Sequence, residues 1–328
     1  MKKIVSVVMS LILLASFLAP GAALAEGKKL SVVTTIFPIY DWVRAILGEN
    51  AENAELTMLL DSGSDLHNYQ PTASDIMKIS MADLFIYVGG ESDRWVDGVM
   101  LTIANPDWKS IKLVDELGDA VKAEEIVEGM EHEHEEDHDH HGDHGHEEEE
   151  EVDEHVWLSL RNAQTLCRAI ADMLSEIDPD NAALYQKNLT AYNGQLADLD
   201  KAYEETVNAA PVKTLLFGDR FPFRYLADDY GLTYYAAFSG CSAESEASFQ
   251  TIVFLAGKVD ELGLNTVMTI ENPKARIAET IVSATARKNQ KILALNSLQS
   301  ITAQDVINGA SYLEAMESNL AVLKEALN

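Results

Sequence analysis

The chain is poor in basic residues and in cysteine. It holds 24 Lys and Arg residues against 54 Asp and Glu, which gives a formal net charge of −30 at pH 7 over 328 residues. Binding to nucleic acid requires Lys and Arg to neutralise phosphates, so this balance argues against a nucleic-acid partner and favours cations. There are two cysteines, and Cys167 lies in an apolar helical pattern typical of a core residue, whereas Cys241 has no such pattern around it. Two cysteines this far apart do not establish a disulfide.

Long apolar runs are absent after the N-terminal segment. There, Lys2 and Lys3 precede the apolar run 4–18, and Ala23-Leu24-Ala25 provides small residues for cleavage. This pattern is typical of a secretory signal, which we assign to residues 1–25, and the run is short for a membrane span. Because no cysteine lies near the cleavage site, we expect no lipid anchor. The mature chain is expected to be exported and soluble, in the periplasm or at the cell surface.

Histidine is unevenly distributed. Seven of the nine histidines lie in one acidic run, namely His132, His134, His138, His140, His141, His144 and His146. Imidazoles interleaved with carboxylates offer ligands to zinc, copper or nickel, although a solvated acidic linker has the same composition. The stretch 131–151 contains no aromatic or aliphatic residue, so it cannot bury enough surface to offset its ordering entropy. We predict a disordered loop over 124–154 that binds extra metal ions weakly.

Strand and helix patterns alternate along the rest of the chain. We expect strands at 30–36, 54–60, 83–88, 214–217, 233–238, 266–270 and 291–295, and helices at 40–47, 72–81, 160–177, 181–209, 223–230, 248–262, 274–287 and 312–327. Such alternation implies βαβ units with mainly parallel sheets. The helix at 181–209 contains no proline and could span roughly 40 Å, the width of a domain.

These patterns predict an α/β protein of two lobes. Each lobe is a mainly parallel sheet flanked by helices, and one long helix joins them with a ligand cleft between the lobes. We place the N-terminal lobe at 26–179, the connecting helix at 180–210 and the C-terminal lobe at 211–328. Ligands of open parallel sheets bind at the carboxyl ends of the strands, so two facing lobes would form a cleft there.

The two remaining histidines stand at element boundaries. His67 lies in the segment SGSDLHNYQPTASDI between a strand and a helix, and His155 lies in VDEHVWLSLRNA directly before a helix. A lone histidine more often has a structural or surface role. Both positions face the predicted cleft, however, and neutral imidazole is the commonest metal-ligand side chain. They are therefore our first candidates for metal ligands.

These segments resemble the zinc and manganese solute-binding proteins of bacterial ABC importers, whose two lobes are joined by a long helix. The family's first-ligand segment reads roughly G-x-D-P-H-x-Y-x-P-T, which matches Gly63–Thr72, and its second reads D-P-H-x-W-L-x-P, which matches Asp153–Leu160. Its His- and acid-rich loop also lies just before the second histidine. The resemblance covers essentially the whole mature chain and implies that His67 and His155 bind the ion.

The second lobe departs from the family pattern. The family places a third ligand, His or Glu, at the position that aligns with Arg220, and an always-charged guanidinium cannot ligate zinc. The fourth, an Asp, aligns with Asn296. We therefore predict that Asp219 or Glu271, each at the end of a predicted strand, completes the shell and that Arg220 pairs with a carboxylate. Other candidates from strand ends are Cys241, Glu244 and Glu246.

The resemblance implies an exported protein, not an enzyme, that binds one Zn²⁺ as cargo, or less favourably Mn²⁺. The expected partner is the membrane permease of an ABC importer, and the chain is expected to act as a monomer. Two histidines with one or two carboxylates suit Zn²⁺, whereas Mn²⁺ prefers more oxygen ligands. The alternatives are a surface zinc-sequestering or adhesion protein without a transporter, and a zinc hydrolase. The pattern H-E-x-x-H occurs in this chain only at 134–138, inside the acidic run, where no apolar helical pattern surrounds it, so it does not favour the hydrolase.

Overall fold

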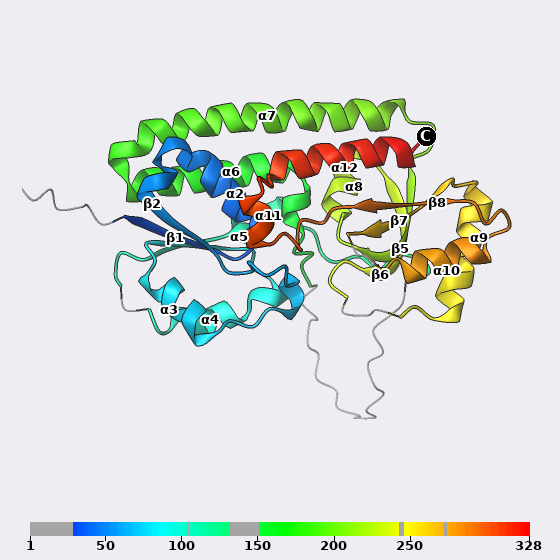
Figure 1. Ribbon diagram of the computed structural model, residues 1–328, viewed down its shortest axis with the longest axis horizontal. Coiled ribbons are helices and arrows are strands. Elements are labelled where there is room, and N and C mark those ends of the chain that lie inside the picture. The colour runs from blue at the N-terminus through cyan, green and yellow to red at the C-terminus, as the bar shows by residue number, and fades with distance from the viewer. Residues whose placement is uncertain (1–28, 104, 131–150, 243–245, 272–273) are drawn as a thin grey trace, which may run out of the picture.

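Two α/β lobes lie side by side beneath one long helix in the computed structural model (Figure 1). The structure describes residues 29–103, 105–130, 151–242, 246–271 and 274–328. The predicted fold class is confirmed: each lobe contains a parallel sheet flanked by helices, and one helix joins them. None of the helices in this described part of the chain is long and apolar enough to cross a membrane.

The first lobe contains a four-stranded parallel sheet in the order β2-β1-β3-β4. Its strands are β1 (Leu30–Thr34), β2 (Ala54–Met58), β3 (Leu84–Tyr87) and β4 (Lys109–Lys112), and its helices are α2 (Phe37–Leu47), α3 (Ala73–Met81), α4 (Trp95–Met100), α5 (Leu113–Leu117) and α6 (Leu160–Ile177). Strand β3 is buried along its whole length, as expected of a strand covered on both faces. The carboxyl ends of these parallel strands therefore meet at one edge of the sheet.

The second lobe repeats this arrangement with the strand order β6-β5-β7-β8, again all parallel. Its strands are β5 (Thr214–Phe221), β6 (Thr233–Ser239), β7 (Thr266–Ile270) and β8 (Lys291–Leu295), and its helices are α8 (Arg224–Tyr230), α9 (Phe249–Leu262) and α10 (Arg276–Ala284). The short helix α11 (Ala303–Ile307) lies against the first lobe, where the Ala303 amide donates to the Asp61 carbonyl over 2.7 Å (Figure 1). The register of β5 against β6 shifts between Phe217 and Arg220. Such an irregularity re-aims the side chains at the end of the strand.

Two helices fix the lobes to each other. The connecting helix α7 (Ala182–Ala209) runs across both lobes, and the C-terminal helix α12 (Tyr312–Ala326) lies along it (Figure 1). The Tyr203 hydroxyl of α7 donates to the Met316 carbonyl of α12 over 2.7 Å. One turn earlier, at the first residue of α12, the Tyr312 amide donates to the buried Asp41 carboxylate of α2 over 2.8 Å. The C-terminal helix thus returns to the first lobe.

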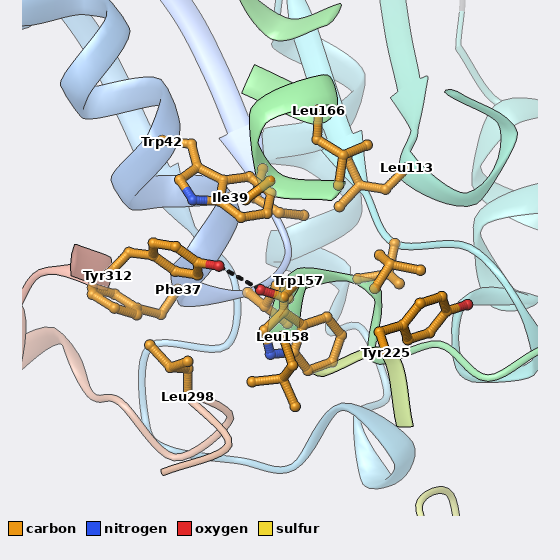
Figure 2. Close-up of a cluster of buried hydrophobic side chains, with 14 of the residues drawn as sticks. Phe37, Ile39, Trp42, Leu113, Trp157, Leu158, Leu166, Tyr225, Leu298 and Tyr312 are labelled. Carbon is orange, nitrogen blue, oxygen red and sulfur yellow. Dashed lines mark hydrogen bonds between the residues drawn. The ribbon is translucent and has the colours of Figure 1, made fainter. Parts of the chain in front are cut away.

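The main core continues from one lobe into the other. Figure 2 shows buried side chains from α2, α6 and α12 gathered around Trp157. The Tyr312 hydroxyl donates to the Trp157 carbonyl over 2.7 Å, and the Trp157 indole nitrogen donates to the Ser297 carbonyl over 2.9 Å. The segment that follows His155 is therefore held by hydrogen bonds to α12 and to the loop after β8.

The structure differs from the sequence predictions in short elements and at loop ends. Helices α4, α5 and α11 and strand β4 were not predicted, and β5 continues past its predicted end at Phe217 to Phe221. The predicted disorder over 124–154 is too wide at both ends, because Met130 and Asp153 are buried and Ala123 pairs with Val152 in an antiparallel bridge. The seven loop histidines lie outside the described residues.

Candidate metal centre

The His67 side chain is positioned by a capped turn at the end of the first sheet. After β2 the chain forms a short 3₁₀ helix, Leu66–Asn68, whose preceding residue Asp65 accepts a hydrogen bond from the His67 amide over 3.0 Å. Leu66 is buried in the core beside it. The capping carboxylate and the buried leucine fix the backbone on either side, so the imidazole projects from a constrained turn.

His155 is held more deeply, with no exposed surface. It follows the Ala123–Val152 bridge and precedes a second 3₁₀ helix, Val156–Leu158, which leads into α6. The Asp153 carboxylate accepts from the His155 backbone amide over 2.9 Å. A histidine ligand at this position can be reached by an ion from solution only if the surrounding segments separate.

The two imidazoles face each other through their Nε2 atoms. The Nε2 atoms of His67 and His155 lie 3.2 Å apart, and the ring centroids are 5.2 Å apart with the planes inclined by 54°. Two nitrogens bound at about 2.0 to 2.1 Å by one tetrahedral ion lie about 3.3 Å apart. The observed separation is therefore the one that a shared zinc ion requires.

The other nitrogen of each ring is tied to the first lobe. Nδ1 of His155 lies 2.9 Å from the Asp153 carboxylate, and Nδ1 of His67 lies 2.8 Å from the Ser92 hydroxyl and 3.6 Å from the Glu154 carboxylate. An ionised carboxylate only accepts hydrogen bonds, so the His155 proton is on Nδ1 and its Nε2 presents a lone pair. Carboxylate–histidine pairs of this kind orient metal ligands and increase their basicity.

The electrostatics keep His67 neutral. Burial first, and the neighbouring His155 ring second, lower the pKa of His67 from its ordinary 6.5 to about 3. Beside it, burial raises the pKa of the Glu154 carboxyl, whose Oε1 accepts from the Ser92 amide over 2.7 Å. A metal-binding imidazole must be unprotonated, so this environment favours the ligating form at neutral pH.

Cys241 is the third potential ligand at this position. Within the described ranges, it forms with His67 and His155 the one group of three His, Cys, Asp or Glu residues whose ligand atoms all lie within 4.8 Å of one another. It lies in the loop after β6, and its amide donates to the Glu124 carboxylate over 3.0 Å. Burial and then the Glu124 carboxylate raise the pKa of its thiol. Neither cysteine forms a disulfide in the part of the chain that the structure describes.

Arg220 pairs with a carboxylate of the opposite lobe. Its guanidinium Nη2 lies 2.5 Å from Asp65 Oδ2, and Nη1 donates to the Ser242 carbonyl over 3.4 Å. Burial acts to raise the pKa of Asp65, but the Arg220 guanidinium outweighs it and holds that pKa below its usual value. Asp65 thus both caps the His67 turn and binds the second lobe.

The two predicted carboxylates lie elsewhere in the second lobe and are not members of the group around His67. Both oxygens of Glu271 accept hydrogen bonds, from the Ser297 amide and hydroxyl at 2.7 Å and from the Ser300 hydroxyl at 2.9 Å. Asp219 accepts from the Arg220 amide over 2.9 Å, and burial raises its pKa. Their role as zinc ligands stays a prediction.

The remaining candidates are placed as follows. Asn296 accepts from the Leu298 amide over 2.7 Å and so stabilises the turn after β8. Glu246 lines a cavity of about 590 Å³ whose walls come mostly from the second lobe, with Asp65 and Asn68 contributed by the first. Glu244 lies outside the described residues.

Sequence reasoning did not single out the groups that orient the histidines. From the sequence, Asp153 and Glu154 are only neighbours of His155, and nothing connects Ser92 with the site. The signal available for Asp153 was its place two residues before a candidate ligand, which allows the carboxylate to reach the ring that it precedes. No sequence signal points to Ser92, because it comes from the loop after β3 and meets His67 only in the folded protein.

Comparisons with known proteins relate the chain to zinc-binding and zinc-uptake proteins. The family described as "ZnuA: Zinc-uptake complex component A periplasmic" matches residues 32–326. The chain is 35% identical over 327 residues to the zinc-binding lipoprotein AdcA of Streptococcus pneumoniae R6, covering 99% of this chain and 61% of the relative. It is 32% identical over 307 residues to the high-affinity zinc uptake system protein ZnuA of Bacillus subtilis, covering 94% of this chain and 90% of that protein.

Solved structures give the same result. The Zn(II)-bound ZnuA-like domain of S. pneumoniae AdcA superposes with a TM-score of 0.69 at 31% identity and covers 91% of this chain and 99% of the domain. The chain therefore spans about three fifths of full-length AdcA and corresponds in extent to its ZnuA-like domain. The relatives favour neither the zinc-sequestering protein without a transporter nor the zinc hydrolase.

Proposed function

Because this chain belongs to the zinc-uptake complex component A family, we propose that it captures one Zn²⁺ ion between its lobes and delivers it to the permease of an ABC importer. The ion is cargo, and the protein acts as an exported, non-enzymatic carrier. The names of the relatives AdcA and ZnuA, which refer to zinc binding and zinc uptake, support this function. The proposal includes a monomeric carrier that meets its permease as a separate chain.

The observation that carries this proposal is the pair of facing Nε2 atoms 3.2 Å apart. Two neutral imidazoles with their lone pairs directed at one point repel each other unless a proton or a metal ion lies between them. Because Asp153 fixes the proton of His155 on Nδ1, a cation at the shared point satisfies both rings. Zinc suits two nitrogen ligands at this spacing.

Release requires the lobes to separate. His155 has no exposed surface, and the Asp65–Arg220 ion pair closes the lobes beside it. Opening would withdraw the second lobe and leave the ion on ligands of the first lobe alone, which lowers its affinity at the moment of delivery. In a carrier whose ligands come from both lobes, ion affinity therefore depends on whether the lobes are open or closed.

The test is zinc affinity in the full chain with His67→Ala and His155→Ala. Competition against a chelating dye should show that each variant loses the tight site, whereas His141→Ala in the acidic run retains it. Circular dichroism of the metal-free proteins should show the same fold in all three. Wild-type affinity in both His67→Ala and His155→Ala would place the site elsewhere and overturn the proposal.

A further inference from the structure

We propose that Cys241 is the metal ligand that the second lobe contributes, so that the site is a His₂Cys centre formed by His67, His155 and Cys241. This inference rests on the proposed zinc-binding function and names its missing ligand. The ligand atoms of all three residues lie within 4.8 Å of one another. The histidines come from the first lobe and the thiol from the loop after β6, so a single ion would bridge the cleft.

The spacing requires only a small adjustment to become a coordination shell. With zinc–nitrogen bonds of about 2.0 to 2.1 Å and a zinc–sulfur bond of about 2.3 Å, the nitrogen and sulfur atoms of a tetrahedral site lie about 3.5 Å apart. The Nε2 atoms of His67 and His155, 3.2 Å apart, are already at about the distance that two nitrogens have when one zinc ion binds both. Because the ligand atoms lie within 4.8 Å of one another, an approach of the thiol by at most about 1.3 Å completes three of the four positions.

The loop that carries Cys241 is built to approach the His155 ring. Gly240 lies directly against it: a Cβ atom added there would be 3.1 Å from both His155 Nδ1 and Cε1, and 3.0 Å from the Phe221 carbonyl oxygen. A side chain at this position would crowd the ring, so glycine favours this close approach. The backbone of Cys241 itself is held by the Glu124 carboxylate, which accepts a hydrogen bond from the Cys241 amide over 3.0 Å.

The second lobe presents no competing ligand at this point in the described structure. Arg220 stands where the family pattern has a His or Glu ligand. Its guanidinium cannot ligate zinc and forms an ion pair with Asp65. Glu271 uses both oxygens within its own lobe, on Ser297 and Ser300. The Cys241 thiol, which follows the neighbouring strand β6, supplies the ligand that Arg220 cannot provide.

Cys167 is a cysteine of the hydrophobic core, away from the candidate metal centre. It has no exposed surface and lies on α6 within the main core, whereas Cys241 is half-buried and lies beside two imidazoles. Cys167 is therefore a matched control, because replacement of either sulfur by oxygen is chemically the same change.

A thiolate ligand limits which divalent metal ions the site would bind tightly. One sulfur and two imidazole nitrogens favour Zn²⁺, Co²⁺ and Cd²⁺ over Mn²⁺, which prefers oxygen ligands. Binding replaces the thiol proton with the metal, so each ion bound at neutral pH releases one proton to the buffer from Cys241. The fourth position remains for water or for an oxygen ligand.

The decisive measurement is X-ray absorption at the zinc edge on the full wild-type chain loaded with half an equivalent of zinc. We expect one sulfur at about 2.3 Å together with two imidazoles. A first shell of nitrogen and oxygen alone would overturn the inference. This measurement needs no variant, so it stands even if a substitution disturbs folding.

Variants supply the second test. Cys241→Ser should weaken zinc binding by at least about tenfold and abolish the thiolate-to-metal absorption of the Co²⁺-loaded protein, whereas Cys167→Ser should retain both. If Cys241→Ser keeps wild-type affinity and absorption while His67→Ala and His155→Ala lose binding, the inference fails and the proposed function stands. If the histidine variants also keep wild-type affinity, the proposed function fails.

Discussion

At the residue scale, the ligating ability of His155 depends on the carboxylate behind it. Asp153 accepts from both the backbone amide and Nδ1 of His155, and it is itself buried. The hydrogen bond to Nδ1 fixes which nitrogen carries the proton and leaves the Nε2 lone pair free to bind an ion. The ring is therefore oriented before any ion arrives, which lowers the entropy cost of binding.

We expect Asp153→Asn to weaken zinc binding by about 10- to 100-fold, because the amide oxygen still accepts the hydrogen bonds but carries no charge. Asp41→Asn is the control: Asp41 is a buried carboxylate that accepts from the Tyr312 amide, away from the metal centre. Its zinc affinity should equal that of the wild type. Equal affinities in Asp153→Asn and wild type, measured by dye competition, would contradict a role for this pair.

A second residue-scale prediction concerns Asp93, a buried acid behind the same site. Burial first, and the Glu154 carboxylate among the other causes, raise the pKa of Asp93 to about 7, while one of its oxygens accepts from the Gly89 amide over 2.9 Å. Between about pH 4 and 7 the folded state holds a proton that the unfolded state has lost. Stability therefore falls as pH rises through this window and is constant above it as far as Asp93 is concerned.

Asp93→Asn should remove this contribution, because an amide mimics the protonated acid and still accepts from Gly89. The free energy of unfolding in urea, measured for metal-free protein at pH 5 and pH 8, should fall less for the variant than for the wild type. The difference between the two pH values isolates the titration from any change in packing. A variant with the same pH dependence as the wild type would show that Asp93 is ionised in the folded protein.

At the element scale, the irregular end of β5 determines what the second lobe offers to the cleft. The register against β6 shifts between Phe217 and Arg220, and Arg220 then reaches Asp65 of the first lobe. The ion pair joins a strand of one lobe to the capped turn that carries His67 in the other. It is therefore placed to hold the closed form without contacting the ion.

Arg220→Gln should accelerate zinc dissociation by about 5- to 30-fold, the factor that corresponds to one or two kcal/mol of closed-state stabilisation. Stopped-flow transfer of zinc to a chelator measures this rate. Lys109→Met is the control, because it breaks an ion pair with Glu176 that lies within the first lobe. If Arg220→Gln releases zinc at the wild-type rate, the Asp65–Arg220 pair does not restrain opening.

Elements were predictable where hydrophobic periodicity is strong. Helix α6 and strands β7 and β8 have the predicted bounds, because their apolar patterns end at clear breakers. Strand β4, whose sequence is KSIK, has no β-branched run to mark it, and Gly218 made the end of β5 look like a loop. Short and irregular elements are determined by their tertiary neighbours, which no local pattern contains.

The metal centre was predictable in part for the same reason. Residue type, position at element boundaries and family resemblance predict His67 and His155 as ligands, and the structure brings their Nε2 atoms to 3.2 Å from each other. Which second-lobe group meets them depends on the β5 irregularity and on the close approach at Gly240, both of which are tertiary features. Sequence reasoning therefore favoured Asp219 and Glu271, which follow predicted strands, over Cys241, which the structure places beside the imidazoles.

At the scale of the whole molecule, the segments that flank the acidic His-rich run lie next to the candidate metal centre. They pair through an isolated bridge between Ala123 and Val152, and the Glu124 amide donates to the Glu151 carbonyl over 2.7 Å. On one side, Glu124 also binds the Cys241 amide, and on the other, the chain continues directly to His155. Ions gathered by residues 131–150 would therefore be released close to the cleft.

The composition of this run predicts many weak sites and no role in the tight one. Residues 131–151 include no aliphatic residue that could be buried in a core, so from the sequence we expect each bound ion to bear an ordering cost. Calorimetry at neutral pH should find one tight zinc site and additional weak ones. Below about pH 6.5 the weak ions should be lost first, because free imidazoles become protonated there.

Deletion of residues 132–146 should remove the weak ions and retain the tight one at wild-type affinity. The deletion keeps Glu131 and residues 147–150, which still connect Met130 to the paired segment that leads to His155. As a control of unchanged length, a variant with all seven histidines of the run replaced by asparagine should lose the weak ions in the same way. If either variant loses the tight site while retaining its fold, the run supplies a ligand to the ion in the cleft, and the division between a preorganised site and a weak reservoir is wrong.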